Sequence, residues 1–330
     1  MLKTLRKILA VILSAVVAFA GIFWFYCRVL QKRSFMAGVV DVVLLATHRS
    51  DKFTYVDVCE EFLAEKAETN LQSVELPEAK FGVSVREEKD GAFQAFIYND
   101  QEEPKQTVFY FHGGAYVNQP NNQQLTMAAR TAKETGAEVV LMVYPKAPVY
   151  TCAESYEACE KYYLEYIEKN SCGKIVFMGD SAGGGMALGM AERLKKESRT
   201  APAELILISP WVDASMENRD MEAYLDKDPM LGIPGCRRIA EVWAGELDVH
   251  DPLVSPLYGD PAGLCPVTLF TGTWEILYPD TLRLFDKLEA AGVDCALTVG
   301  ENMIHCYPII PAPEAKGAQA VIWNAILRER

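Results

Sequence analysis

Apolar positions dominate the first thirty residues of the chain. Twenty consecutive residues without a charge, Ile8 to Cys27, follow the basic residues Lys3, Arg6 and Lys7. About twenty apolar residues span a hydrocarbon core as a helix, whereas the hydrophobic region of a signal peptide has only about 7–15. The pattern therefore predicts a single-pass membrane anchor within residues 1–33, and we expect the protein at a membrane.

A cleaved signal peptide is the alternative reading of this segment. Ala18-Phe19-Ala20 has the small residues of a cleavage site, yet the apolar run continues beyond it to Tyr26. The aromatic residues Phe23 to Tyr26 suit the membrane–water interface, which favours an uncleaved anchor. Basic residues stand on both sides of the run, so the sequence leaves open which face of the membrane holds the rest. Those on the second side are Arg28, Lys32 and Arg33.

Beyond the anchor the pattern predicts a short helical segment and then an α/β domain. Residues 34–78 mix apolar and charged positions in a helical manner. From residue 79 to 330, a hairpin is expected first, with FGVSV from Phe81, a turn at 89–91 and a second strand to Tyr98. Continuous apolar runs then alternate with amphipathic stretches, which indicates a mostly parallel sheet with helices on both faces. The runs are Thr107–Phe111, Glu138–Val143, Lys174–Met178, Glu204–Ser209, Val267–Thr271 and Cys295–Val299.

Composition and charge limit the kinds of partner and cofactor that the protein is expected to bind. Lys and Arg number 32 against 45 Asp and Glu, a net charge of −13, which argues against a nucleic-acid partner because phosphates require a surplus of cations. The nine cysteines form no CxxC pair and no Cys/His metal spacing, so we expect no metal site. The sequence leaves the oligomeric state open.

A nucleophile motif follows the third of these runs. Gly179-Asp180-Ser181-Ala182-Gly183 joins a strand pattern directly to a helical pattern, which is the context that a G-x-S-x-G elbow requires. The glycines let the backbone crowd beneath a serine held in a strained turn. We therefore predict Ser181 as a nucleophile.

An earlier run ends in His112-Gly113-Gly114. Adjacent glycines after a strand free backbone N–H groups to bind an oxyanion, so the expected donors are Gly113, Gly114 and, after the nucleophile, Ala182. His112 is expected to hold this loop through hydrogen bonds and not to act as a base.

The base and the acid follow from chain order. In hydrolases with a G-x-S-x-G elbow, the catalytic residues follow one another along the chain in the order Ser, acid, His. Of the four histidines, His48 and His112 precede Ser181, His250 follows no suitable strand, and His305 follows the last run. Two carboxylates compete as the acid. Glu275 lies on the loop after Val267–Thr271 and is preferred, while Asp280 lies at the start of the next helix and is expected to support the loop or the helix.

These motifs resemble the hormone-sensitive-lipase-like family of α/β-hydrolases, which includes bacterial carboxylesterases and arylacetamide deacetylases. His112-Gly113-Gly114 is similar to its HGG motif, and Gly179 to Gly184 to its GDSAGG elbow, in which Asp180 is a supporting residue. Tyr144-Pro145-Lys146-Ala147-Pro148 is similar to its Y-x-L-A-P segment, with Lys where Leu is usual. At the acid, Glu275-Ile276-Leu277 stands where Asp-Pro-Leu is usual, although some bacterial members similarly carry Glu.

The resemblance implies an α/β-hydrolase fold with a helical cap over the active site. Residues 34–78 and an insertion near 215–245 are expected to form this cap. It implies a serine carboxylesterase that hydrolyses short- to medium-chain acyl esters and uses no organic cofactor. A deacetylase or lactonase using the same residues is the alternative within enzymes. A non-catalytic ligand-binding protein is the alternative outside them, and the joint presence of Ser181, a carboxylate and His305 counts against it.

Overall fold

An eight-stranded sheet forms the body of the protein in the computed structural model, which describes residues 2–329. The strands are β1 (Val85–Asp90), β2 (Phe93–Tyr98), β3 (Gln106–Phe111), β4 (Glu138–Val143), β5 (Lys174–Asp180), β6 (Glu204–Ile208), β7 (Val267–Gly272) and β8 (Cys295–Gly300). Their order in the sheet is β1-β2-β4-β3-β5-β6-β7-β8. The pairs β1–β2 and β2–β4 are antiparallel and the other pairs are parallel, so the carboxyl ends of β3 to β8 share one edge.

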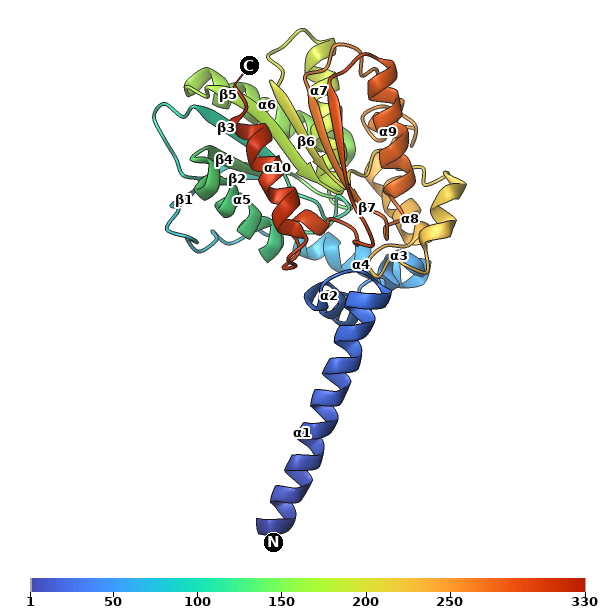
Figure 1. The fold of residues 1–330 in the computed structure, drawn as a ribbon. Helices are drawn as coiled ribbons and strands as arrows, with labels where there is room; N and C mark the ends of the chain where they lie inside the picture. Colours follow the sequence, from blue (N-terminus) through green and yellow to red (C-terminus); the bar gives the residue numbers. More distant parts are fainter. Residues whose placement is uncertain (1, 330) are drawn as a thin grey trace.

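Helices cover both faces of this sheet (Figure 1). Alternate residues of the strands enter two cores, as Phe109 and Phe111 of β3 pack on one side and Val108 and Tyr110 on the other. The first core also contains α6 (Cys152–Lys169), α7 (Ala182–Lys196), α8 (Ile233–Ala244) and α9 (Tyr278–Ala290). The second contains α5 (Asn122–Thr135) and α10 (Ala315–Leu327). The expected mostly parallel, doubly covered sheet is confirmed.

Side-chain caps fix where two of these helices begin. Asn121 and Gln124 form a reciprocal capping box at the start of α5, and Thr151 and Glu154 form another at α6. Gly136, with a φ of 70°, ends α5 in the left-handed conformation that glycine adopts without steric cost. These local signals define where α5 begins and ends and where α6 begins, before the strands β4 and β5 that follow them.

The first strand of the hairpin begins later than the sequence predicted. Phe81 and Gly82 have φ values of 57° and 75°, and these left-handed conformations cannot continue an extended strand. An isolated bridge between Lys80 and Val83 turns the chain, and β1 starts only at Val85. The alternating pattern of FGVSV therefore overstated the strand by four residues.

The first of the N-terminal helices stands apart from the sheet, and the others pack on the body. The first helix, α1 (Leu2–Phe25), projects from the body as a stalk, and a π-helical turn (Tyr26–Leu30) ends it (Figure 1). Thr4–Leu30 is the one span among the described residues that is long and apolar enough to cross a membrane, and its most apolar stretch is fully exposed. Next come α2 (Phe35–Ala46), α3 (Asp51–Thr54) and α4 (Val56–Thr69), of which α3 and α4 pack against α8.

Candidate active site

Ser181 lies on a strained turn between β5 and α7. Its φ of 54° and ψ of −125° are rare for a residue with a side chain, and such strain is typical of functional sites. The turn is fixed by Ser181 N, which donates to Ile208 O at 2.8 Å, and by Ser181 O, which accepts from Trp211 N at 2.9 Å. The residue is 9% exposed.

Glycines beneath the Ser181 turn allow neighbouring backbone segments to lie in close contact. A Cβ at Gly179 would lie 2.2 Å from Gly183 O, and a Cβ at Gly183 would lie 2.0 Å from Phe111 O. The elbow therefore packs directly on the end of β3, which carries the His112-Gly113-Gly114 loop.

Asp180 ties that loop to the elbow. Its Oδ1 accepts hydrogen bonds from Tyr110 Oη at 2.8 Å and Gly113 N at 3.0 Å, and its Oδ2 accepts one from Gln124 Nε2 at 2.8 Å. Burial raises the pKa of Asp180, and the three donors offset only part of this effect. Gly113 N is thus engaged by a carboxylate and is not left to receive an oxyanion, in contrast to the expectation from the sequence.

The two residues after Gly113 have unusual backbone conformations. Gly114 and Ala115 have φ values of 130° and 56°, which turn this loop sharply after the strand. Ala182 begins α7, and the first N–H groups of a helix have no partner within it. The conformation of Ala115 was not expected from the sequence, because an alanine gives no sign that its backbone is left-handed.

His112 is fully buried beneath the same loop. Its Nδ1 lies 2.7 Å from Gly113 O, and its ring stacks on Tyr144 with centroids 4.6 Å apart. Burial, with a smaller effect of the nearby Lys146 ammonium, lowers the pKa of His112 to about 3, so the imidazole is neutral. A neutral, buried ring that bonds its own loop is suited to support and unsuited to take protons from a substrate.

Lys146, the departure from the Y-x-L-A-P pattern, is also buried. Its Nζ donates to Tyr144 O at 2.6 Å, and burial lowers the pKa of the amine to about 7. At the position where the Y-x-L-A-P segment usually has Leu, this chain therefore has a buried, hydrogen-bonded amine of weak basicity.

Glu275 and His305 form a buried pair on the loops after β7 and β8. Glu275 Oε2 lies 2.5 Å from His305 Nδ1, and both side chains are almost completely enclosed. The second oxygen, Oε1, accepts three further hydrogen bonds at 2.6–2.8 Å. The donors are Ser209 Oγ, Thr271 Oγ1 and Gly272 N. One oxygen is thus fixed by the protein frame while the other orients the imidazole.

The electrostatics of this pair favour a protonated imidazole. Burial would lower the pKa of His305, but Cys306 and the carboxylate of Glu275, both within bonding distance of the ring, outweigh it and hold that pKa well above its usual value. Nε2 of His305 lies 3.4 Å from Cys306 Sγ. Among the described residues no hydrogen bond joins Ser181 Oγ to His305, and catalytic hydrogen bonds are often formed only with substrate bound.

The other carboxylate, Asp280, lies away from the imidazole. It stands in the first turn of α9, where its Oδ1 accepts from Asn218 Nδ2 at 2.7 Å and Arg283 Nη1 at 2.8 Å. Burial raises its pKa. In the structure, therefore, Glu275 contacts His305, whereas Asp280 bonds to Arg283.

Two residues that the sequence did not reveal connect these loops. Ser209 Oγ accepts from Cys306 N at 3.0 Å while donating to Glu275, and so joins the acid loop to the base loop. Asp228, from the segment before α8, accepts Ile276 N at 3.0 Å, and burial raises its pKa to about 6. Ser209 appears in the sequence only as the end of the run Glu204–Ser209, and nothing in the local sequence marks Asp228.

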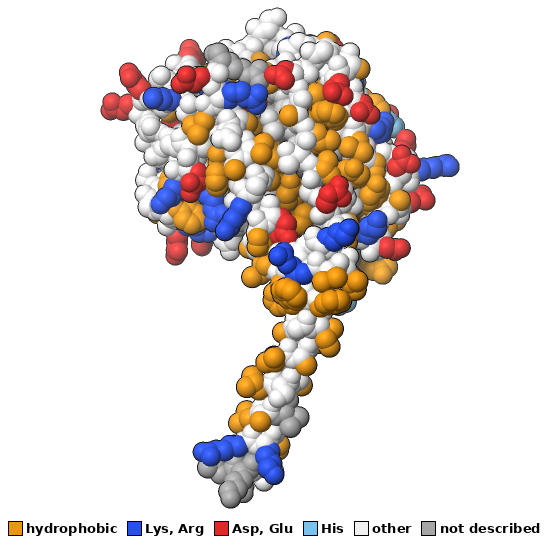
Figure 2. Space-filling view, viewed as in Figure 1, with side chains coloured by type: hydrophobic (Ala, Val, Ile, Leu, Met, Phe, Trp, Pro, Cys, Tyr) orange, Lys and Arg blue, Asp and Glu red, His pale blue; other side chains and the backbone are white. Residues whose placement is uncertain are grey.

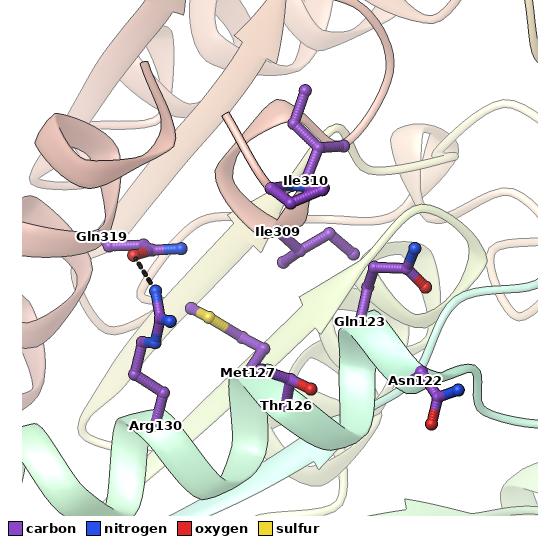
Figure 3. A pocket seen from close by; sticks show the side chains of 9 residues that line it. Asn122, Gln123, Thr126, Met127, Arg130, Ile309, Ile310 and Gln319 are labelled. Atoms are coloured by element: carbon purple, nitrogen blue, oxygen red, sulfur yellow. Dashed lines mark hydrogen bonds between the residues drawn. The ribbon is translucent and has the colours of Figure 1, made fainter. Parts of the chain in front are cut away.

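The hollow drawn in Figure 3 lies elsewhere, between α5 and the segment that leads to α10. It has a volume of about 250 Å³, and Arg130 Nη1 donates to Gln319 Oε1 across it at 3.2 Å. Neither the serine nor the buried pair lines it, so we assign it no part in the chemistry. In the described residues, no group of three or more His, Cys, Asp and Glu side chains is arranged to hold a metal ion.

Comparisons with known proteins identify the family of this chain. A family described as alpha/beta hydrolase fold matches residues 108–309. An esterase from Acinetobacter venetianus is 30% identical over 226 residues, which cover 67% of this chain and 75% of that protein. An acetyl-hydrolase from Streptomyces hygroscopicus is 28% identical over 232 residues, with the same two coverages.

Solved structures match over most of the chain. One from Staphylococcus aureus has a TM-score of 0.80 and 26% identity, covering 86% of this chain and 96% of that one. The HSL homologue EstE7, from a metagenome library, has a TM-score of 0.74 and 23% identity over 88% of this chain and 97% of its own, a likeness of fold. The chain belongs to the α/β-hydrolase family whose profile it matches, and its enzyme class is that of the carboxylic ester hydrolases.

Proposed function

We propose that the protein is a serine carboxylesterase whose nucleophile, base and acid are Ser181, His305 and Glu275. The observation that carries the proposal is the buried Glu275–His305 pair, 2.5 Å apart, at the same sheet edge as a serine on a strained turn. In the proposed reaction, Ser181 Oγ bonds to the ester carbonyl carbon as its proton passes to His305 Nε2. The imidazolium then protonates the departing alcohol, and water releases the acid by the reverse sequence.

The charge that develops on the carbonyl oxygen needs preorganised donors. We propose the amides of Gly114, Ala115 and Ala182 for this role, since Gly113 N is bonded to Asp180. The proposed acid holds His305 in one tautomer and stabilises the imidazolium without taking its proton.

A cap assembled from two segments would limit the acyl group. We propose that α3 and α4 together with α8 form it. Cys59 Sγ donates to Gly235 O at 3.6 Å, and Glu60 pairs with Arg238 at 2.5 Å. A closed cap supports short- to medium-chain acyl esters as substrates. Faster hydrolysis of p-nitrophenyl palmitate than of p-nitrophenyl butyrate would contradict this part of the proposal.

We also propose that α1 is an uncleaved, single-pass membrane anchor. Its 24 residues reach about 36 Å at 1.5 Å per residue, and a hydrocarbon core is about 30 Å thick. Intact mass measurement of the protein extracted from membranes tests this proposal. A mature chain that begins after Ala20 would identify a signal peptide instead.

Ser181→Ala is the first test of the catalytic proposal. Loss of the nucleophile should lower kcat on p-nitrophenyl butyrate by about 10⁶, as in other triads. Ser198→Ala, at an exposed serine just after α7, is the matched control and should keep wild-type activity. If the Ser181→Ala protein, folded by circular dichroism, retains more than about a hundredth of the activity, Ser181 is not the nucleophile.

A further inference from the structure

The helix α2 presents an apolar surface that the body of the protein leaves uncovered. Ala37, Gly38 and Asp41 face inward, and the large side chains on the other side are about half exposed. We call these side chains the α2 surface: Met36, Val42, Val43 and Leu45. A helix with this much exposed apolar side chain, directly after an apolar stalk, needs a partner that can cover it.

The end of the stalk packs on the loops of the active site. The Arg33 guanidinium lies 4.2 Å from the ring of Trp274, the residue before Glu275. Asn302 Nδ2, from the loop that leads to His305, donates to Gln31 O at 3.1 Å. Ser34 N and Oγ donate to Glu314 at 2.5 and 2.8 Å. The stalk therefore leaves the body at the carboxyl edge of the sheet, beside the catalytic loops (Figure 1).

Charge is distributed unevenly along the chain. The first 52 residues hold eight of the 32 Lys and Arg but only two of the 45 Asp and Glu. Figure 2 shows Lys and Arg side chains at the far end of the stalk and where it meets the body, with hydrophobic side chains between them. An apolar strip bordered by cations, on a protein with a net charge of −13, complements an anionic lipid surface.

We propose that the α2 surface lies in the headgroup–acyl boundary of an anionic bilayer and seats the catalytic edge against it. The substrates are then esters dissolved in the bilayer, with a small acyl group for the capped pocket and a lipid-like alcohol. The proposal rests on the esterase function and on the anchoring by α1 proposed above.

Brominated lipids test the position of α2 without requiring activity. The full chain is placed in nanodiscs of phosphatidylglycerol with brominated phosphatidylcholine, and Leu45→Trp is compared with Leu327→Trp, at an exposed leucine on the last residue of α10. After subtraction of wild-type emission, roughly half or more of the Leu45→Trp signal should be quenched and almost none of the Leu327→Trp signal. Equal quenching at the two sites overturns the proposal. A second copy of the chain covering α2 would leave Leu45→Trp unquenched and give two chains per disc, which also overturns it.

Two butyrate esters test the substrate class. Hexadecyl butyrate enters the bilayer and methyl butyrate stays in water, yet both present the same acyl group. In phosphatidylglycerol nanodiscs, Leu45→Glu should lower the ratio of the hexadecyl to the methyl rate about tenfold, and Leu327→Glu should leave it unchanged. Replacing phosphatidylglycerol with phosphatidylcholine should lower the wild-type ratio in the same direction. An unchanged ratio in both comparisons overturns the proposal.

Failure of the proposed function is distinguishable from failure of this inference. Absence of methyl butyrate hydrolysis by the wild type would reject the esterase, while the quenching experiment would still decide where α2 lies. Methyl butyrate hydrolysis with no quenching of Leu45→Trp would keep the esterase and reject the α2 surface.

Discussion

Asp180 and Glu275 are both buried at the carboxyl edge of the sheet, Asp180 beneath the proposed nucleophile and Glu275 beside the proposed base. Each accepts three hydrogen bonds from neutral donors within the protein frame. They differ in one partner, because the second oxygen of Glu275 faces the imidazole of His305, whereas both oxygens of Asp180 are used by neutral groups. The same kind of enclosure therefore makes one carboxylate a brace for the oxyanion loop and the other a source of negative charge for a base.

Among the changes to the buried carboxylates and their partners, removal of the charge at Glu275 is expected to have the largest effect. Glu275→Gln keeps the shape but loses the charge that stabilises the imidazolium, and the comparable change in a Ser-His-Asp protease lowers kcat by about 10⁴. The measurement is kcat on p-nitrophenyl butyrate with folding checked by circular dichroism. If kcat falls no further in Glu275→Gln than in Asp180→Asn, the two carboxylates do not have the different roles described above.

The pH dependence should change with the same substitution. The proposed base, His305, takes a proton only when neutral, so a pKa raised well above its usual value moves the acid limb of kcat/KM to higher pH than for an ordinary histidine. Glu275→Gln lowers that pKa and should move the limb to lower pH. The stability conferred by the pair is fully present below about 6.5, the unfolded histidine pKa, and is lost as the pH rises through the folded pKa. An unshifted limb in Glu275→Gln would mean that another group titrates.

Asp180→Asn is expected to act mainly through structure. An amide at this position would turn its NH₂ group toward one of the donors, such as Gln124 Nε2, and leave a buried hydrogen bond unmade, at a cost of about 1–3 kcal/mol. We expect a lower Tm and a kcat reduced by about ten- to a hundredfold through the displaced Gly113–Gly114 loop, with no shift of the acid limb. A shifted limb would show that Asp180 acts on His305 as Glu275 does.

Ser209→Ala should have a smaller effect. The variant removes one of the three donors to Glu275 Oε1 and also the acceptor of Cys306 N, so both catalytic loops lose one contact. We expect kcat to fall up to about tenfold, with a slight shift of the acid limb, since neighbouring donors remain. Thr271→Val is the matched comparison, because it removes a donor and leaves the Cys306 bond intact. Equal effects of the two variants would show that the link between the loops does not matter.

Asp280→Asn is expected to have the smallest effect on the reaction. Its carboxylate bonds Asn218 and Arg283, and a helix-end carboxylate contributes about 0.5–2 kcal/mol to stability. Activity should stay within a few fold of wild type, measured beside Glu275→Gln. If Asp280→Asn abolishes turnover and Glu275→Gln does not, the assignment of the acid is wrong.

The fold was largely predictable because strands buried on both faces leave continuous apolar runs. The run Glu138–Val143 coincides with β4, and the runs at Lys174 and Cys295 begin where β5 and β8 begin. The hairpin was less predictable, because left-handed conformations at Phe81 and Gly82 leave no mark on hydrophobic alternation.

The site was predictable where residue type determines chemistry and less so where backbone geometry decides. Ser181, Glu275 and His305 could be chosen by motif and order, although the choice between Glu275 and Asp280 needed the contacts of each carboxylate. The use of Gly113 N by Asp180 depends on a backbone direction that no residue letter specifies. Ser209 and Asp228 reach the site only through long-range packing.

The crowded glycines of the elbow also have a consequence for protein engineering. A Cβ at Gly113 would lie 2.4 Å from Asp180 Oδ2, and one at Gly185 would lie 2.2 Å from Trp211 O. Substitution beneath the nucleophile is therefore sterically closed, whatever property a redesign seeks. Under the proposed function, a change in the esters that the protein accepts would have to come from the side chains of the proposed cap helices α4 and α8.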